Sequence, residues 1–205
     1  MFRRGPLRRG FGRAFGRGMG RGQHGAPPPA GAAPPAARQA LQQANQLRSA
    51  GRYLEAAGIF EQLALLAGAN NLPRRAALLT LQEGECRALG GQCAAGSQRL
   101  RQGLDLLAAN GNWQALAQAG PRAAASLEQA GCLTEAAGLR AWLERMLPGA
   151  SPAEAAPPAS PARLPAKCPF CGASLRSNEV EWLDALSAEC PYCGSSVAAE
   201  APARG

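Results

Sequence analysis

Two short cysteine motifs of the same form constrain this chain more than any other feature. The sequence contains Cys168-Pro169-Phe170-Cys171-Gly172 and, 22 residues later, Cys190-Pro191-Tyr192-Cys193-Gly194. Two cysteines separated by two residues can direct both thiolates at one metal ion, and four thiolates at about 2.3 Å complete a tetrahedral zinc shell. A glycine after each pair suits a tight turn with positive φ. These two hooks therefore predict one metal site, formed by Cys168, Cys171, Cys190 and Cys193.

The paired hooks resemble those of the zinc-ribbon family over residues 167–197, with all four ligand positions filled. The resemblance implies one structural Zn²⁺, because four cysteines leave no coordination position open for catalysis. Iron is the alternative metal, since a rubredoxin is similar in using two such hooks, although typically with a longer spacer. Disulfide pairing of the hooks is the third interpretation. The 18 residues between the hooks are enough for a short hairpin that returns the second pair to the first.

The region before the hooks has the apolar spacing of helices. Apolar residues recur at three- and four-residue steps in two successive segments: Ala37, Ala40, Leu41, Ala44 and Leu47, then Ala56, Phe60, Leu63 and Ala67. Gly51 follows the first segment, where a glycine ends a helix. Asn70 and Asn71 end the second, and Pro73 suits an early position in the next. The pattern predicts a succession of helices.

These helices show an internal repeat. Gly51, Gly91 and Gly131 lie 40 residues apart, and Leu66, Leu106 and Met146 keep the same register. The segment Gly51-Arg52-Tyr53-Leu54-Glu55-Ala56, with Phe60 following, resembles the turn and second helix of a tetratricopeptide repeat. The resemblance implies a mainly α fold over residues 36–147: an α-solenoid of three antiparallel helix pairs, followed by the small C-terminal four-cysteine zinc ribbon. Gly120-Pro121 predicts that the fifth helix is kinked or split, into Asn112–Ala119 and Pro121–Ala130.

Low-complexity segments flank the predicted domains. Residues 1–35 are rich in Arg and Gly and then in Pro, and we expect a disordered tail. Residues 148–166 carry six prolines among Ala and Ser, which predicts a linker and a ribbon that moves independently of the helices. Residues 198–205 are expected to form a second disordered tail.

The net charge of +8 is concentrated in the N-terminal tail. Seven arginines supply it, and no acid occurs in the first 53 residues: Arg3, Arg4, Arg8, Arg9, Arg13, Arg17 and Arg21. The remainder carries 8 − 7 = +1, so an RNA or anionic lipid partner is expected to bind only this tail. The ribbon has more acids than bases and a formally dianionic metal centre, so it should repel phosphates.

The predicted function is that of a non-enzymatic protein-interaction adaptor. The repeat region offers only scattered acids, such as Glu83 and Glu85, and the single histidine, His24, lies in the tail, so no catalytic constellation is indicated. An apolar stretch of the ribbon either contacts a protein or peptide partner or packs inside: Val180, Trp182, Leu183 and Leu186. The alternative is an RNA- or anionic-surface-associated factor tethered through the Arg/Gly tail.

The remaining cysteines and tryptophans are expected to be structural. Cys86, Cys93 and Cys132 are predicted to be small buried thiols, and Trp113 and Trp142 to lie in the core. Unpaired thiols and thiolate ligands both suit a reducing compartment, so we expect a cytoplasmic protein. No segment has the length and apolar character of a transmembrane span.

Overall fold

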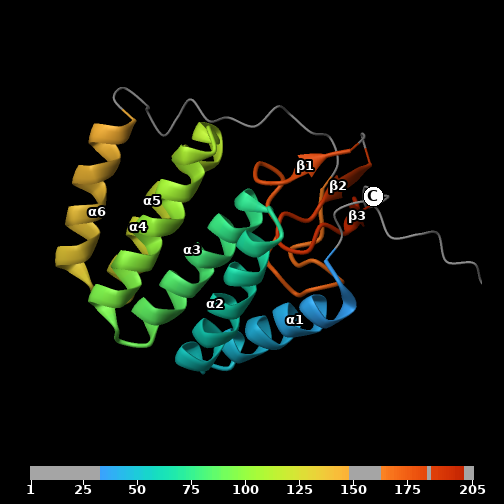
Figure 1. The fold of residues 1–205 in the computed structure, drawn as a ribbon, viewed down its shortest axis with the longest axis horizontal. Helices are drawn as coiled ribbons and strands as arrows, with labels where there is room; N and C mark the ends of the chain where they lie inside the picture. Colours follow the sequence, from blue (N-terminus) through green and yellow to red (C-terminus); the bar gives the residue numbers. More distant parts are fainter. Residues whose placement is uncertain (1–32, 148–162, 184–185, 201–205) are drawn as a thin grey trace, which may run out of the picture.

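The computed structural model describes residues 33–147, 163–183 and 186–200. This part of the chain contains six helices (Figure 1): α1 (Pro35–Ser49), α2 (Tyr53–Ala69), α3 (Pro73–Leu89), α4 (Cys93–Ala109), α5 (Trp113–Gln129) and α6 (Leu133–Met146). A small antiparallel sheet follows in the order β1 (Glu181–Trp182), β2 (Ser187–Glu189), β3 (Ser196–Ala198). The chain is mainly helical. Nearly all of the predicted N-terminal tail, most of the linker and residues 201–205 lie outside the described residues.

Each of the first five helices ends in the same tight turn. One residue of each turn has left-handed backbone, with φ between 55° and 83°: Gly51, Asn71, Gly91, Gly111 and Gly131. The amide of the following residue reaches back to the last helical turn, as from Arg52 to the carbonyl of Leu47 at 2.9 Å. This is the hydrogen bond of a Schellman motif. The helix ends predicted at Gly51, Gly91 and Gly131 are confirmed. The turn recurs every 20 residues, so the 40-residue spacing of these glycines spans two helices.

The predicted split of the fifth helix at Gly120-Pro121 does not occur, because α5 is continuous from Trp113 to Gln129. Pro121 is exposed, so water can hydrate the carbonyl that loses its helical donor. Gly120 is buried against α6, where an added Cβ would collide with the side chain of Leu143. The glycine therefore lets the side chain of Leu143 pack close to α5, and the proline is tolerated beside it.

The helices α3 and α4 approach each other through glycines. A Cβ added at Gly84 would lie 2.7 Å from the amide nitrogen of Leu100, and one added at Gly96 would lie 2.7 Å from the amide nitrogen of Ala88. Both distances are too short for any side chain, so only glycine allows the two backbones to pack at this separation.

An ion cluster connects α2, α3 and α4. Glu83 is 1% exposed, accepts a hydrogen bond from the Nε atom of Arg87 at 2.7 Å and forms an ion pair with the Nε atom of Arg99 at 3.0 Å. Glu61 of α2 pairs with the same two guanidinium groups, at 3.0 Å and 2.7 Å. Burial of a carboxylate is costly unless it is paired. In the sequence, Glu83 was one of several acids with no evident partner. In the structure, its carboxylate belongs to a buried network in which arginines balance its charge.

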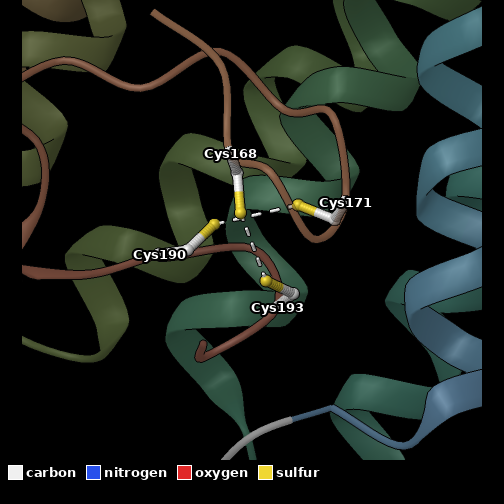
Figure 2. Close-up of side chains that lie close together, drawn as sticks. All are labelled: Cys168, Cys171, Cys190 and Cys193. Carbon is white, nitrogen blue, oxygen red and sulfur yellow. Dashed lines mark hydrogen bonds between the residues drawn. The ribbon is translucent and has the colours of Figure 1, made fainter. Parts of the chain in front are cut away.

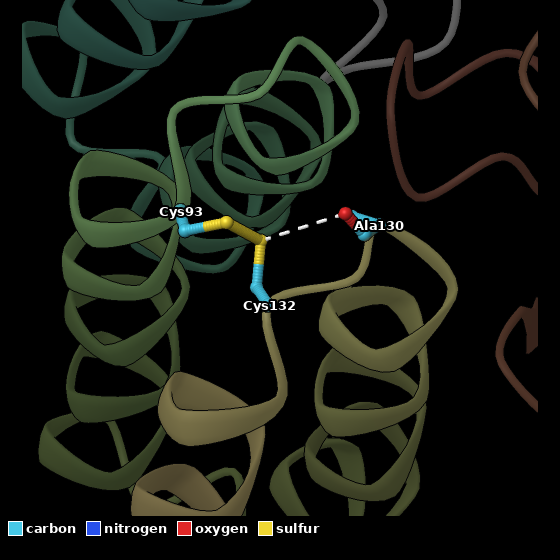
Figure 3. Close-up of a disulfide and its surroundings, with 3 residues drawn as sticks. All are labelled: Cys93, Ala130 and Cys132. Atoms are coloured by element: carbon cyan, nitrogen blue, oxygen red, sulfur yellow. Dashed lines mark hydrogen bonds between the residues drawn. A yellow bond between two sulfur atoms is a disulfide. The ribbon is translucent and has the colours of Figure 1, made fainter.

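Some of the cysteines and tryptophans lie in other environments than the sequence predicted. Trp142 is buried, whereas Trp113 begins α5 and is 49% exposed. Cys86 is a buried thiol, and burial raises its pKa to about 12. The predicted thiols Cys93 and Cys132 instead form a disulfide (Figure 3). The helix repeat explains this correction, because Cys93 begins α4 and Cys132 directly precedes α6, with their Cα atoms 5.4 Å apart.

The C-terminal region packs against the first helices. We call residues 163–183 and 186–200 the four-cysteine module; it begins before and ends after the predicted 167–197, because Arg163 and Glu200 form an antiparallel bridge. One apolar cluster joins residues of the module with residues of α1, α2 and α3: Leu175 and Val197 with Leu41, Phe60 and Leu79. The expected independence of the module is therefore wrong, since it shares a core with the helices.

Among the described residues, no helix combines the length and apolar character that crossing a bilayer would require.

Candidate metal centre

The two hooks have the same local structure. In the first hook, the amide of Cys168 donates to the carbonyl of Ala173 at 2.8 Å, and the amide of Gly172 donates to the carbonyl of Cys168 at 2.9 Å. The second hook has the same two bonds, from Cys190 to Ser195 at 2.9 Å and from Gly194 to Cys190 at 2.8 Å. Gly172 and Gly194 have φ of 74° and 68°, as their positions after the cysteine pairs predicted. The turns orient both thiols of a hook to the same side.

The four thiols converge on one point (Figure 2), and their Sγ atoms all lie within 4.8 Å of one another. The Sγ atoms of Cys168 and Cys193 are 3.8 Å apart, as are those of Cys171 and Cys190. A tetrahedron with metal–sulfur bonds of about 2.3 Å has edges of about 3.8 Å. The arrangement fits one tetrahedral metal ion. None of the four is in a disulfide, so the disulfide interpretation of the hooks is wrong.

The crowded thiols also favour a cation electrostatically. Hydrogen bonds from neighbouring thiols lower the pKa of Cys193, and they lower the pKa of Cys168 to about 7. The same crowding raises the pKa of Cys171 and Cys190 far above the ordinary range. A cation among the four sulfur atoms would favour the thiolate form of all four cysteines. Among the described residues, this is the one group of metal-ligating side chains with such convergence.

No family model matches this chain, and searches of curated proteins and of solved structures also found no match. The likeness to tetratricopeptide repeats and to zinc ribbons therefore rests on the residues quoted above.

Helix α1 and the residue just before it form hydrogen bonds with both hooks. The side-chain amide of Asn45 donates to the carbonyl of Cys171 at 3.1 Å. The amide of Ala33, just before α1, donates to the carbonyl of Cys193 at 2.7 Å. The second cysteine of each hook is thus fixed by a residue more than a hundred positions away. No local signal in the sequence marks Asn45 or Ala33 for this role.

The acidic side of the module faces arginines of α3 and α5. Arg74 pairs with Glu181 at 3.2 Å, and Arg122 pairs with Glu179 at 2.7 Å. In the sequence, the acid excess of the module indicated only that it should repel phosphates. In the structure, two of these acids also form ion pairs that hold the module against α3 and α5.

A polar cluster lies deeper in the same interface. The hydroxyl of Tyr192 accepts from Gln82 Nε2 at 3.4 Å, and burial raises the pKa of this tyrosine. Arg48 of α1 donates to Gln82 and pairs with Glu85 at 3.4 Å. Burial nevertheless raises the pKa of Glu85. Hydrogen bonds and one ion pair thus position Tyr192 between α1 and α3.

The four predicted partner-binding residues divide into two pairs. Val180 and Trp182 are partly buried and pack against the shared apolar cluster, and the Trp182 indole donates to the carbonyl of Ser177 at 3.1 Å. Leu183 and Leu186 flank the β1–β2 connection and are 54% and 69% exposed. Of the four residues, only Leu183 and Leu186 expose more than half of their surface.

Proposed function

We propose that this protein is a non-enzymatic protein-interaction scaffold, an α-solenoid of three helix pairs with a C-terminal zinc ribbon. The closed coordination of the metal centre supports a structural role, because four buried thiolates leave no position for a substrate. We assign the metal as zinc. The short spacer between the hooks favours zinc over iron, since rubredoxin-type sites typically use a longer one.

The observation that carries the interaction role is the exposure of Leu183 and Leu186 at 54% and 69%. They flank a hairpin connection on a module that is itself anchored to the helices by Arg74 and Arg122. Such anchoring lowers the entropic cost of presenting apolar side chains to a partner. Covering a leucine side chain contributes about 1.5–3 kcal/mol.

Affinity capture with full-length protein tests the scaffold proposal. A Leu183→Ser/Leu186→Ser bait should lose proteins that the wild type retains. Leu133→Ser is the matched control, because this leucine of α6 is 67% exposed and lies outside the module. A wild-type bait that retains no protein above background would contradict the proposal. The purified protein should be colourless with one equivalent of zinc, and bound iron would contradict the metal assignment.

The N-terminal arginines favour a second candidate, an RNA- or anionic-surface-associated factor. The observation is the charge pattern, with seven arginines in the first 21 residues and no acid in the first 53. Single-stranded RNA binding should be lost in a variant lacking residues 1–32 and should weaken between about 50 mM and 200 mM salt. Vesicles with anionic headgroups provide the parallel assay. Equal binding by full-length and truncated protein would show that the tail is not the segment that binds RNA or the anionic surface. The cytoplasmic placement stays a prediction.

A further inference from the structure

The Cys93–Cys132 disulfide joins the starts of two helices (Figure 3). Cys93 is the first residue of α4, and Cys132 is the N-cap of α6. The other five cysteines of the chain are free thiols, and four of them form the candidate metal centre. Conditions that keep such thiols reduced are those in which a disulfide is usually transient and redox-sensing. The coexistence of the two therefore points to a bond that is made and broken, not to a permanent cross-link.

The two cysteines of the disulfide differ in exposure. Cys93 is partly exposed, whereas Cys132 is 2% exposed. The residues on either side of Cys93, which are Gln92 and Ala94, are also exposed. Thiol–disulfide exchange begins when a thiolate attacks one of the two sulfur atoms, and access decides which sulfur is attacked. The difference in exposure favours attack at the sulfur of Cys93, with the sulfur of Cys132 as the leaving group.

The surroundings of both cysteines suit their reduced forms. The start of a helix stabilises a thiolate through its free amides and its dipole. The first turn of α4 contains no acidic residue, whereas the first turn of α6 contains Glu135, so a thiolate is favoured at Cys93. The Sγ atom of Cys132 lies 3.9 Å from the carbonyl oxygen of Ala130. A reduced thiol at Cys132 therefore has a hydrogen-bond acceptor beside it.

We propose that Cys93–Cys132 is a reversible thiol–disulfide exchange site whose co-reactant is a dithiol reductant. One thiolate of the dithiol attacks the sulfur of Cys93, the bond between the two protein sulfurs breaks, and Cys132 leaves as a thiolate that takes up a proton. The second thiol of the dithiol then displaces Cys93 from the mixed disulfide. Two electrons and two protons pass to the protein, and the reductant becomes a disulfide. This site does not depend on the proposed scaffold function.

Reduction should loosen the start of α6. Leu133, the first residue of this helix, is 67% exposed, so it has little apolar contact with the rest of the protein. Two large side chains hold the second half of the helix: Trp142 is 4% exposed with the guanidinium of Arg101 4.2 Å from its ring centroid, and Leu143 lies close to Gly120. Loss of the disulfide should therefore open the first turn of α6 and leave its second half in place.

The first experiment treats the full-length, oxidised protein with dithiothreitol in native buffer and alkylates the thiols that appear. The rate at which Cys93 and Cys132 are labelled should rise in proportion to the dithiol concentration, because exchange takes place in the folded protein. Cys86 is the internal control, since this thiol is buried, its pKa is raised to about 12, and it should stay unlabelled. Peptide mapping after brief exposure to a monothiol should find the mixed disulfide on Cys93.

The second experiment compares the hydrogen exchange of the oxidised and reduced proteins. Amides in the first turn of α6 should exchange several-fold faster after reduction, and amides from Trp142 onward should be unchanged. The Cys93→Ala/Cys132→Ala variant, with and without dithiol, controls for any effect of the reductant on the candidate metal centre.

Three results would each overturn the inference. A labelling rate independent of the dithiol concentration would show that the bond becomes accessible only when the protein unfolds. A mixed disulfide found mainly on Cys132 would contradict the assigned point of attack. Equal hydrogen exchange at the start of α6 in the two redox forms would show that the bond does not hold this turn in place.

Discussion

The side-chain amide of Asn45 in α1 donates a hydrogen bond to the backbone carbonyl of Cys171 in the first hook at 3.1 Å. The two residues are 126 positions apart. The same amide also donates to the carbonyl of Leu41 in its own helix, at 2.9 Å. Asn45 therefore connects α1 directly to a candidate metal ligand, so the stability of α1 and the affinity of the metal site should be coupled.

Asn45→Ala should weaken metal binding and reduce the free energy of unfolding by about 1 kcal/mol, the usual contribution of a hydrogen bond. Asn70→Ala is the matched control, because Asn70 also donates to a carbonyl four residues earlier but has no bond to a hook. Competition with a zinc-binding dye measures the affinity. Equal loss of affinity in both variants would show that the Asn45–Cys171 bond does not couple the two parts.

Removing the metal should destabilise the helices as well as the module. Cys168→Ser, or chelation of the wild type, should lower the melting temperature followed by helical circular dichroism, because the hooks and α1 share one apolar cluster. Phe170→Ser is the control, since Phe170 lies in the same hook, is 46% exposed and is not a ligand. An unchanged helical melt after complete zinc loss would restore the two-domain interpretation made from the sequence.

Glu83→Gln should be strongly destabilising. The substitution leaves Arg87 and Arg99 without their buried partner, and breaking a buried pair costs about 3 kcal/mol, the lower end of the usual range because both arginines are partly exposed. Glu55→Gln removes the fully exposed pair with Arg52 and should leave denaturant unfolding unchanged. Similar midpoints for the two variants would mean that the cluster contributes no more than a surface ion pair.

Reduction of the Cys93–Cys132 disulfide should also destabilise the protein. The bond closes a loop of 39 residues, and the chain-entropy model gives about 4 kcal/mol for a loop of this size. A phosphine reductant should lower the melting temperature of the wild type and leave a Cys93→Ala/Cys132→Ala variant unaffected. Two free thiols at these positions in non-reducing buffer would show that the bond does not form.

Local features of this protein were accessible from the sequence. The positive φ of Gly172 and Gly194, the helix ends at Gly51, Gly91 and Gly131, and the burial of Phe60 and Leu63 each follow from a residue and its near neighbours. The four candidate metal ligands were accessible for the same reason, because the short spacing within each hook already brings two thiols together. Such features depend on turn chemistry and apolar periodicity, which act over a few residues.

Only the tertiary structure placed the module on the helices, paired Cys93 with Cys132 and enclosed Glu83 between two arginines. The prolines of residues 148–166 predicted a module that moves independently of the helices. That prediction failed because composition describes the connecting segment and not the surfaces of the two parts that it connects. Pro121 was interpreted as dividing the fifth helix, whereas α5 continues through it and the neighbouring Gly120 lies close to the side chain of Leu143. The sequence by itself determined where the chain turns and which thiols form the candidate metal site, since these depend on local geometry. Contacts between distant residues decided the rest, because they depend on which faces the folded helices present to one another.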